Sequence, residues 1–211
     1  DVGLDFAMFN RKIDGSFSYF WRETKGTYGV ITQPGVFGIG SPSSNIGDFK
    51  SWGWELSLNW RDKIGEDFNY TIGANLSDNN NKVVKFLNRT NVSGGLVSLL
   101  EGYSKNSIFG YRTDGYFQSA EEVSNNKVNH QNPSLGPGDI RYVDVNGDQI
   151  ISSGKGNLED PGDLVYLGTQ NPRYSFGLNL GFNYKGFDFS AFIQGVGKRE
   201  FLLPSVLTLP Y

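Results

Sequence analysis

The stretch Trp52-Gly53-Trp54-Glu55-Leu56-Ser57-Leu58-Asn59-Trp60 decides the fold class of this chain of 211 residues. Large apolar residues occupy every second position, and small or polar residues occupy the positions between them. Side chains of a β-strand point alternately to its two faces, so the pattern predicts a strand with one apolar and one polar face. Its length is close to the roughly ten residues that a tilted strand needs to cross an apolar band about 25 Å thick.

Five further segments alternate in the same way, at residues 2–8, 16–21, 68–77, 174–183 and 187–194, with Phe192 as an exception in the last. None of the six runs contains Lys or Arg, whose cost facing lipid at mid-bilayer is about 2–4 kcal/mol. The tryptophans lie at or near the ends of runs, where interfacial aromatic girdles are found.

The connections between these runs alternate between short and long. Residues 10–15, 61–67 and 185–186 are short connections, whereas residues 23–51 and 78–173 are long ones. Outer-membrane barrels have short periplasmic turns and long extracellular loops. The sequence therefore predicts an all-β fold, namely a segment of a transmembrane antiparallel β-barrel with about six strands and long extracellular loops.

Six strands are fewer than the eight of the smallest barrels of this kind, and the chain ends in a loop-like sequence at residues 207–211. We therefore expect the chain to be a fragment of a larger protein. The alternative is a soluble carbohydrate-binding β-sandwich, although sandwich strands are more often about five or six residues long.

Composition argues against several functions. The net charge is −3, and the sequence has no basic patch of the kind that nucleic-acid binding requires. There is no cysteine, and the single histidine, His130, lies in a polar stretch that predicts a surface position. No catalytic constellation can be built on these residues, so we expect no enzyme. A membrane-barrel protease or acyltransferase stays open as an alternative.

A candidate metal site begins at Asp144-Val145-Asn146-Gly147-Asp148. Oxygen-bearing side chains at Asp144, Asn146 and Asp148 have the spacing that begins a calcium loop. The pattern departs from an EF-hand because Gln149 stands where Gly is expected and Lys155 where Glu is expected. Two readings are open: a structural Ca²⁺ in the 144–160 loop, with Asp160 or Asp163 as a remote ligand, or an Asx-rich turn without metal. No other cofactor is expected.

Aromatic residues of the second long connection are candidate substrate contacts, since rings stack on the apolar faces of sugars. These are Tyr103, Tyr111 and Tyr116, together with Phe109 and Phe117. The alternative for each is packing within the loop or contact with a partner. Asp5 and Glu55 on the polar face are either ligand or plug contacts or parts of a solvated wall.

The ordered series of short motifs resembles the SusC/RagA-type TonB-dependent transporters of Gram-negative Bacteroidota. The resemblance spans most of the chain and rests on residues 2–6, 45–48 with 52–56, 101–103, 108–115, 137–142, 144–148, 186–188 and 194–195. It implies that residues 1–211 are part of a single 22-stranded barrel domain, with the plug domain and the remaining strands outside this chain.

The resemblance also implies location in the outer membrane and import of oligosaccharides or peptides. It implies a SusD-like surface lipoprotein as partner, and the TonB–ExbB–ExbD complex acting through the plug region. The bilayer surrounds such a barrel, and no nucleic acid takes part.

Overall fold

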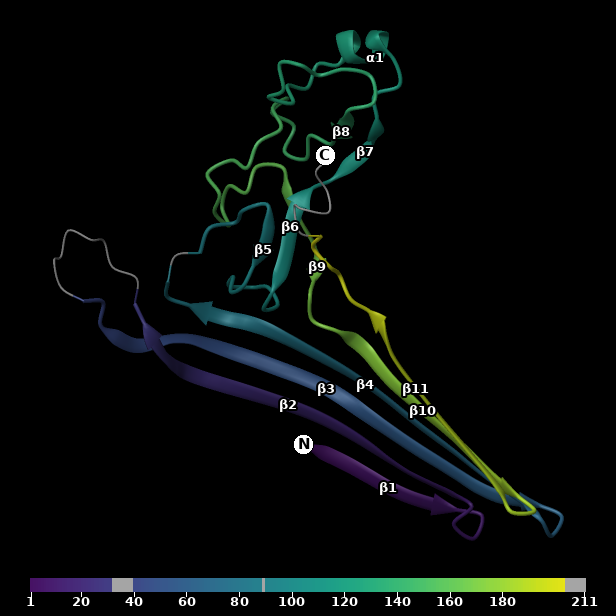
Figure 1. Cartoon of the computed structure of the whole chain (residues 1–211). Helices are drawn as coiled ribbons and strands as arrows, with labels where there is room; N and C mark the ends of the chain where they lie inside the picture. The colour runs from purple at the N-terminus through teal and green to yellow at the C-terminus, as the bar shows by residue number, and fades with distance from the viewer. Residues whose placement is uncertain (32–39, 89, 204–211) are drawn as a thin grey trace.

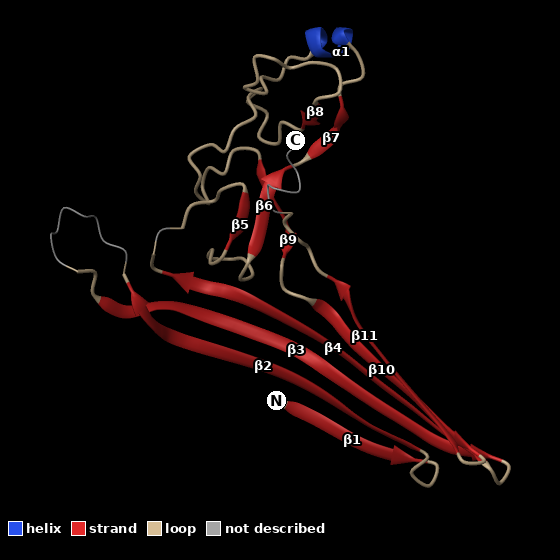
Figure 2. Ribbon diagram, viewed as in Figure 1, coloured by secondary structure: helices blue, strands red, loops and turns tan. Residues whose placement is uncertain are grey.

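The computed structural model describes residues 1–31, 40–88 and 90–203, so residues 207–211 lie outside the described part. Its main feature is an open antiparallel sheet of six strands in the order β1-β2-β3-β4-β10-β11 (Figure 1; Figure 2). The strands are β1 (Val2–Met8), β2 (Ile13–Val30), β3 (Ser43–Ile64), β4 (Phe68–Phe86), β10 (Arg173–Tyr184) and β11 (Phe187–Lys198). The all-β prediction is confirmed, and so is the presence of a strand at each of the six alternating runs.

The described residues between β4 and β10 form a second body, which we call the loop assembly. It stands on the end of the sheet opposite the short turns (Figure 1). A three-stranded sheet in the order β5-β6-β9 joins it to the barrel strands, and a two-stranded sheet, β7-β8, lies beyond. Its elements are β5 (Gly95–Val97), β6 (Ser107–Tyr111), β7 (Thr113–Tyr116), α1 (Ala120–Asn125), β8 (Ile140–Tyr142) and β9 (Leu164–Thr169). The helix α1 begins where the Ser119 side chain accepts a hydrogen bond from the Glu122 N–H, a typical N-cap.

Three strands are much longer than the alternating runs that predict them. β2 continues to Val30, β3 begins at Ser43 and β4 continues to Phe86, so most of the expected loop at residues 23–51 is strand. Charged residues occupy both phases of these extensions, as at Arg22 and Glu23 in β2 and at Lys82 and Lys85 in β4, so neither face is uniformly apolar and the alternation disappears. The strands continue through these extensions by backbone pairing, which is interrupted by bulges between Thr24 and Thr27 and between Asp48 and Phe49.

Two of the three turns at the other end are tighter than expected. The first contains only the four residues between Met8 and Ile13, with Phe9, Asn10 and Arg11 all at positive φ, and the second contains only residues 65–67. The third is Lys185-Gly186, as predicted, with φ of 47° and 86°. Positive φ at both central positions is typical of the type I′ turn, which matches the twist of a hairpin.

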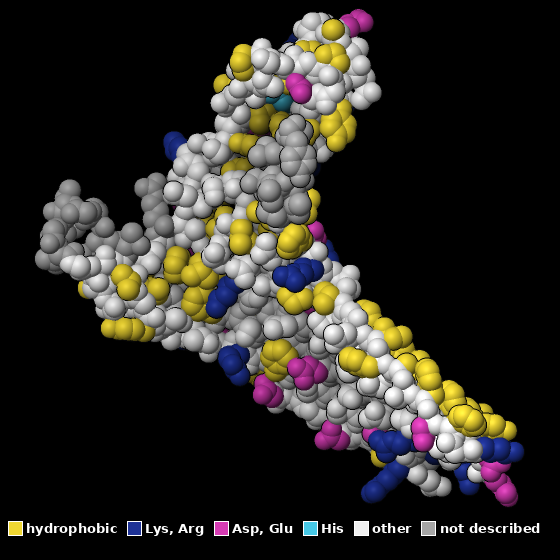
Figure 3. All heavy atoms as spheres, in the orientation of Figure 1, with side chains coloured by type: hydrophobic (Ala, Val, Ile, Leu, Met, Phe, Trp, Pro, Cys, Tyr) yellow, Lys and Arg dark blue, Asp and Glu magenta, His cyan; other side chains and the backbone are white. Residues whose placement is uncertain are grey.

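The pairing register places all six apolar runs on one side of the sheet. Directly paired residues point to the same face, and one such row reads Leu4, Phe17, Leu56, Leu76, Phe176 and Gly195. Among the described residues no second sheet covers this apolar face, and its rings are open: Phe17 is 41% and Phe189 50% exposed. The space-filling view shows hydrophobic side chains in a strip along β10 and β11 (Figure 3). The sandwich alternative is therefore wrong, because it needs a sheet against this face.

Aromatic residues concentrate at both ends of the apolar face. Near the turns, Trp60 meets the Tyr70 ring at 5.7 Å and Phe182 stacks on Phe189 at 5.2 Å. At the other end Trp21 pairs with Trp52. From Trp52 to Trp60 the strand rises by about 26 Å, at about 3.3 Å per residue, which matches the thickness of an outer-membrane apolar band.

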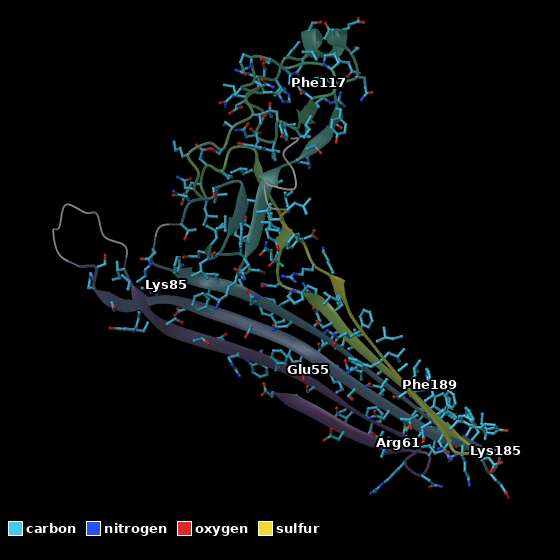
Figure 4. The ribbon with its side chains drawn as sticks, viewed as in Figure 1. Glu55, Arg61, Lys85, Phe117, Lys185 and Phe189 are labelled. Atoms are coloured by element: carbon cyan, nitrogen blue, oxygen red, sulfur yellow. The ribbon has the colours of Figure 1, made fainter. Side chains whose placement is uncertain are left out.

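The Lys and Arg side chains lie outside the apolar runs even though the strands themselves contain several of them. At the turn end, Lys12 pairs with Asp62 at 2.7 Å and Arg61 with Asp14 at 3.0 Å. Figure 4 shows Arg61 and Lys185 together at this end, below the exposed ring of Phe189. No helix in the described part of the chain is long and apolar enough to cross a membrane.

Candidate functional site

The polar face of the sheet carries its candidate contacts in successive rows. One row contains Ser18, Glu55, Ser77 and Ser175, and the next contains Phe20, Gly53 and Asn79. Above them lie Arg22, Ser51 and Asn81, which pair across β2, β3 and β4. Glu55 is thus on the polar face, as predicted, and it is exposed.

A hollow of about 360 Å³ opens where the polar face meets the start of β10. The ring of Phe20 lies over Gly53, where a Cβ atom would be 2.7 Å from the ring. Glu55, Ser77 and Asn79 line the same hollow and contribute polar atoms to it. An apolar ring among polar neighbours is the combination that ligand sites use for orientation and contact. Phe20 is the site residue that the sequence analysis missed, and the signal was its place on the polar phase of an alternating run.

A second hollow of about 410 Å³ adjoins the first at Asn79 and Asn81. Its lining differs in charge, because it contains Arg22, Lys50 and Lys105 and no carboxylate. Lys105 comes from the loop assembly, and its Nζ atom lies 4.0 Å from the centre of the Phe49 ring. The two hollows are thus continuous along the part of the polar face that lies nearest the loop assembly.

A buried ion pair joins β4 to β10 in the row of Tyr19 and Trp54, close to the end of the apolar face that lies nearer the loop assembly. The guanidinium of Arg173 donates from both Nε and Nη2 to the carboxylate of Asp78, the latter at 2.6 Å. Asp78 is only 6% exposed. The two residues lie 95 positions apart in sequence, so the pair fixes both ends of the long connection.

The three candidate tyrosines occupy different environments in the loop assembly. Tyr103 packs against the core of the assembly and meets the rings of Phe109 at 5.1 Å and Tyr166 at 5.6 Å. Tyr111 also packs on this core, and its ring lies 5.5 Å from that of Tyr142. Tyr116 is 57% exposed. The structure does not bring the three together, and substrate contact by any of them stays a prediction.

The two phenylalanines that accompanied these tyrosines are core residues. Phe109 belongs to a cluster with Val92, Val97, Leu100 and Leu164, and is 4% exposed. Phe117 is 2% exposed and lies inside the loop assembly (Figure 4). For both rings the packing alternative holds.

The candidate metal loop is held by its own hydrogen bonds. Asp144 accepts from the N–H groups of Gly147 at 2.7 Å and Gln149 at 2.9 Å. Asn146 accepts from the Asp148 N–H, and Asp148 accepts from the Ile150 N–H. These are Asx turns, in which a side chain takes the place of a backbone carbonyl. No cluster of three His, Cys, Asp or Glu side chains with metal-binding geometry occurs in the described ranges.

Of the two remote ligands proposed from the sequence, Asp160 and Asp163, the second is fully buried beneath this loop. Its two oxygens accept from the N–H groups of Val145 at 2.7 Å and Ser152 at 2.8 Å. The donor set has calcium's preferred chemistry, yet each of these carboxylate oxygens already binds a backbone N–H. The hydrogen bonds therefore account for the order of the loop, and cation binding stays a prediction.

His130 is not the surface residue that its polar neighbours predict. Its ring lies 5.4 Å from that of Phe117 and 6.0 Å from that of Tyr142, and both ring nitrogens are buried without a hydrogen-bond partner. Burial lowers the pKa of His130 below its ordinary value of 6.5. The polar stretch around it folds back on the loop assembly through the bridge between Asn129 and Ile150, which sequence alone does not reveal.

Known proteins with similar sequences are TonB-dependent receptors. TonB-dependent receptor P26 of Formosa agariphila is 30% identical over 208 residues, which cover 95% of this chain and 20% of the relative. TonB-dependent receptor SusC of Bacteroides thetaiotaomicron is 25% identical over 90% of this chain and 18% of its own length. The chain thus spans about a fifth of the length of the curated relatives it matches. No family model matches the chain.

Solved structures agree on the fold. The structure of the RagAB peptide transporter matches with a TM-score of 0.61 and 20% identity, over 91% of this chain and 20% of the matched chain. The RagAB peptide importer in its open-open state matches with a TM-score of 0.66 and 19% identity, over 92% of this chain and 19% of the matched chain. At this identity the likeness concerns the fold.

Register, aromatic belts and structural likeness together define a wall segment of a membrane β-barrel. The resemblance predicted from the motifs is confirmed: the chain is homologous to a segment of the SusC/RagA-type TonB-dependent receptors. These relatives are receptors and transporters rather than enzymes.

Proposed function

We propose that this chain forms part of the barrel wall of an outer-membrane receptor that imports a nutrient in a TonB-dependent way. Residues 1–211 would belong to one barrel domain, with the plug in another part of the same protein. The cargo would be an oligosaccharide or a peptide, and a SusD-like lipoprotein would cover the outer end. Support comes from the named relatives, of which one group is TonB-dependent receptors and another a peptide importer.

One observation carries the proposal: the face made by the six apolar runs is continuous, open and bounded by aromatic residues at both ends. A water-soluble protein rarely leaves a contiguous apolar surface of this extent uncovered. Lipid hydrocarbon can cover this apolar face without a desolvation penalty. Pairing between the strands supplies the hydrogen bonds that their backbone N–H and C=O groups need in the bilayer.

The test uses two neighbouring residues of β10 that point to opposite faces. Leu178 lies on the apolar face, paired with Ala74 and Ile193, and Asn179 lies on the polar face, paired with Gly73. Leu178→Arg places a cation near mid-bilayer, at a cost of about 2–4 kcal/mol. Asn179→Arg adds the same charge to the water-facing side and is the matched control.

We expect Leu178→Arg to reduce the amount of folded receptor in the outer membrane several-fold, as measured by heat-modifiable migration on gels. Asn179→Arg should leave that amount near the parent level. Equal amounts of folded protein for the two variants would contradict the membrane assignment. Uptake of labelled oligosaccharides and peptides by cells that express the Asn179→Arg receptor, with and without TonB, then tests import.

A further inference from the structure

The second hollow of the polar face has three cationic residues in its lining, Arg22, Lys50 and Lys105. We propose that it holds a carboxylate or sulfate group carried by the imported substrate. This inference rests on the proposed function, because the polar face lines the route of a substrate only if the sheet is a barrel wall.

The position of the hollow follows from strand pairing. Arg22, Ser51 and Asn81 form one row across β2, β3 and β4, and Asn79 lies in the adjacent row. The row that contains Arg22 lies four residues of β3 nearer the loop assembly than the row that contains Glu55. This separation corresponds to about 13 Å of strand. The acidic side chains of the polar face are Asp5, Asp14, Glu55 and Asp188. They lie in the Glu55 row or nearer the short turns, so they are well separated from the cationic hollow.

Two of the cations in the hollow have no counter-charge. Neither Arg22 nor Lys105 forms an ion pair with any described residue, whereas Lys50 is neutralised by Glu23 at 2.8 Å. Other cations of the sheet and its turns do have partners: Lys12 pairs with Asp62, Arg61 with Asp14, and Arg173 with Asp78. A pair of uncompensated cations in one concave place favours occupancy by an anion.

The loop assembly fixes Lys105 in place over the hollow. The backbone N–H of Lys105 donates to the Asn81 Oδ1 atom at 2.7 Å, and its Nζ atom rests on the Phe49 ring. Because the Asn81 oxygen is occupied, its amide nitrogen is left as a donor. Two parts of the chain that are 24 residues apart thus build the site jointly.

Neutral donors complete the lining. The Thr27 hydroxyl is buried and has no hydrogen-bond partner among the described residues, and Ser51 adds a second hydroxyl. A buried hydroxyl without a partner is unfavourable, and a bound oxyanion can accept its hydrogen bond. Guanidinium, ammonium, hydroxyl and amide groups around one hollow are the donors that recognise carboxylate and sulfate oxygens.

The experiment titrates the purified full-length receptor with defined probes. Oligogalacturonate is the anionic sugar probe, its methyl-esterified form is the neutral sugar, hexaglutamate is the anionic peptide, and inorganic sulfate is the free ion. Arg22→Ala with Lys105→Ala removes both cations. Arg112→Ala with Lys127→Ala removes the same charges from exposed positions in the loop assembly and is the control.

We expect the parent and the control to bind at least one anionic oligomer, with an affinity that falls as salt is added. The Arg22/Lys105 variant should bind that oligomer at least tenfold more weakly. The oligomer that binds identifies the source of the anion as sugar or peptide. Equal affinity in both variants, binding of free sulfate alone, or preference for the neutral sugar would overturn the anion site.

These failures are distinct from failure of the proposed function. If the Arg22/Lys105 variant reaches the outer membrane, imports its cargo and binds anions as the parent does, the anion site is contradicted but the import function is not. Loss of the difference between Leu178→Arg and Asn179→Arg would remove the importer itself.

Discussion

At the scale of single residues, the Asp78–Arg173 pair joins two strands that the long connection separates in sequence. Asp78→Ala leaves the Arg173 guanidinium without its partner in a largely buried place, where breaking such a pair costs about 3 kcal/mol. We expect a lower urea midpoint for unfolding of the full-length receptor. Asp67→Ala breaks the exposed pair with Lys185 at 3.6 Å and should change stability by less than about 1 kcal/mol. Equal effects would show that burial of the pair is irrelevant.

The buried imidazole of His130 predicts a pH dependence confined to the loop assembly. Its pKa is lowered by burial, so the unfolded assembly binds more protons than the folded one as pH falls below about 6.5. Stability is therefore complete above this pH and decreases from there toward the folded pKa.

Hydrogen exchange of loop peptides, corrected for the intrinsic pH effect, measures this decrease. We expect exchange in residues 117–151 of the full-length receptor to accelerate between pH 7.5 and 5.5. His130→Phe keeps a ring between Phe117 and Tyr142 and removes the titration, so its exchange should not change with pH. Acceleration that persists in His130→Phe would assign the effect to another group.

At the scale of elements, the β2–β3 pairing depends on a close contact at Gly15. A Cβ atom there would lie 2.6 Å from the Phe6 ring and 2.7 Å from the Ser57 carbonyl oxygen, which the pairing holds in place. Gly15→Ala should lower stability by about 1–3 kcal/mol, because the strands must separate to make room.

The temperature at which the folded, heat-modifiable form of the receptor is lost gives the measurement. Gly3→Ala is the matched control, since its nearest atom is the Phe17 carbonyl oxygen at an ordinary 3.8 Å. We expect that control to melt with the parent. A Gly15→Ala receptor that also melts with the parent would show that the sheet adapts there.

The sequence correctly predicts the strands whose two faces meet different surroundings, because one face then carries apolar residues and the other carries polar residues. In β10, the alternation from Tyr174 to Asn183 gives both the strand and its orientation. The extension of β2 beyond Trp21 carries charged or polar residues on both phases, so it has no periodic signal and its sequence predicts a loop. The candidate site could not be predicted because its residues are brought together by non-local contacts. Phe20 reaches the first hollow through strand pairing, and Lys105 reaches the second through packing of the loop assembly.

At the scale of the whole molecule, the short turns and the loop assembly lie at opposite ends of the sheet (Figure 1). The ion pairs at the turns and the cationic hollow near the loop assembly each lie beyond one end of the apolar face. Under the proposed function the apolar face fixes the depth of the sheet in the bilayer. Each end must then face a different compartment.

The chain contains no cysteine, so single cysteines can report this orientation without background from the 211 residues. Glu66 lies in the second turn and Lys127 in the loop assembly. Both are exposed, and neither forms an ion pair with a described residue, so Glu66→Cys and Lys127→Cys break none. A maleimide-linked polyethylene glycol too large to cross the outer membrane should label Lys127→Cys on intact cells. It should label Glu66→Cys only after the membrane is permeabilised, because barrel turns face the periplasm and long loops face outward. Labelling of Glu66→Cys on intact cells would reverse the orientation, and with it the assignment of the cationic hollow to the outer half of the import route.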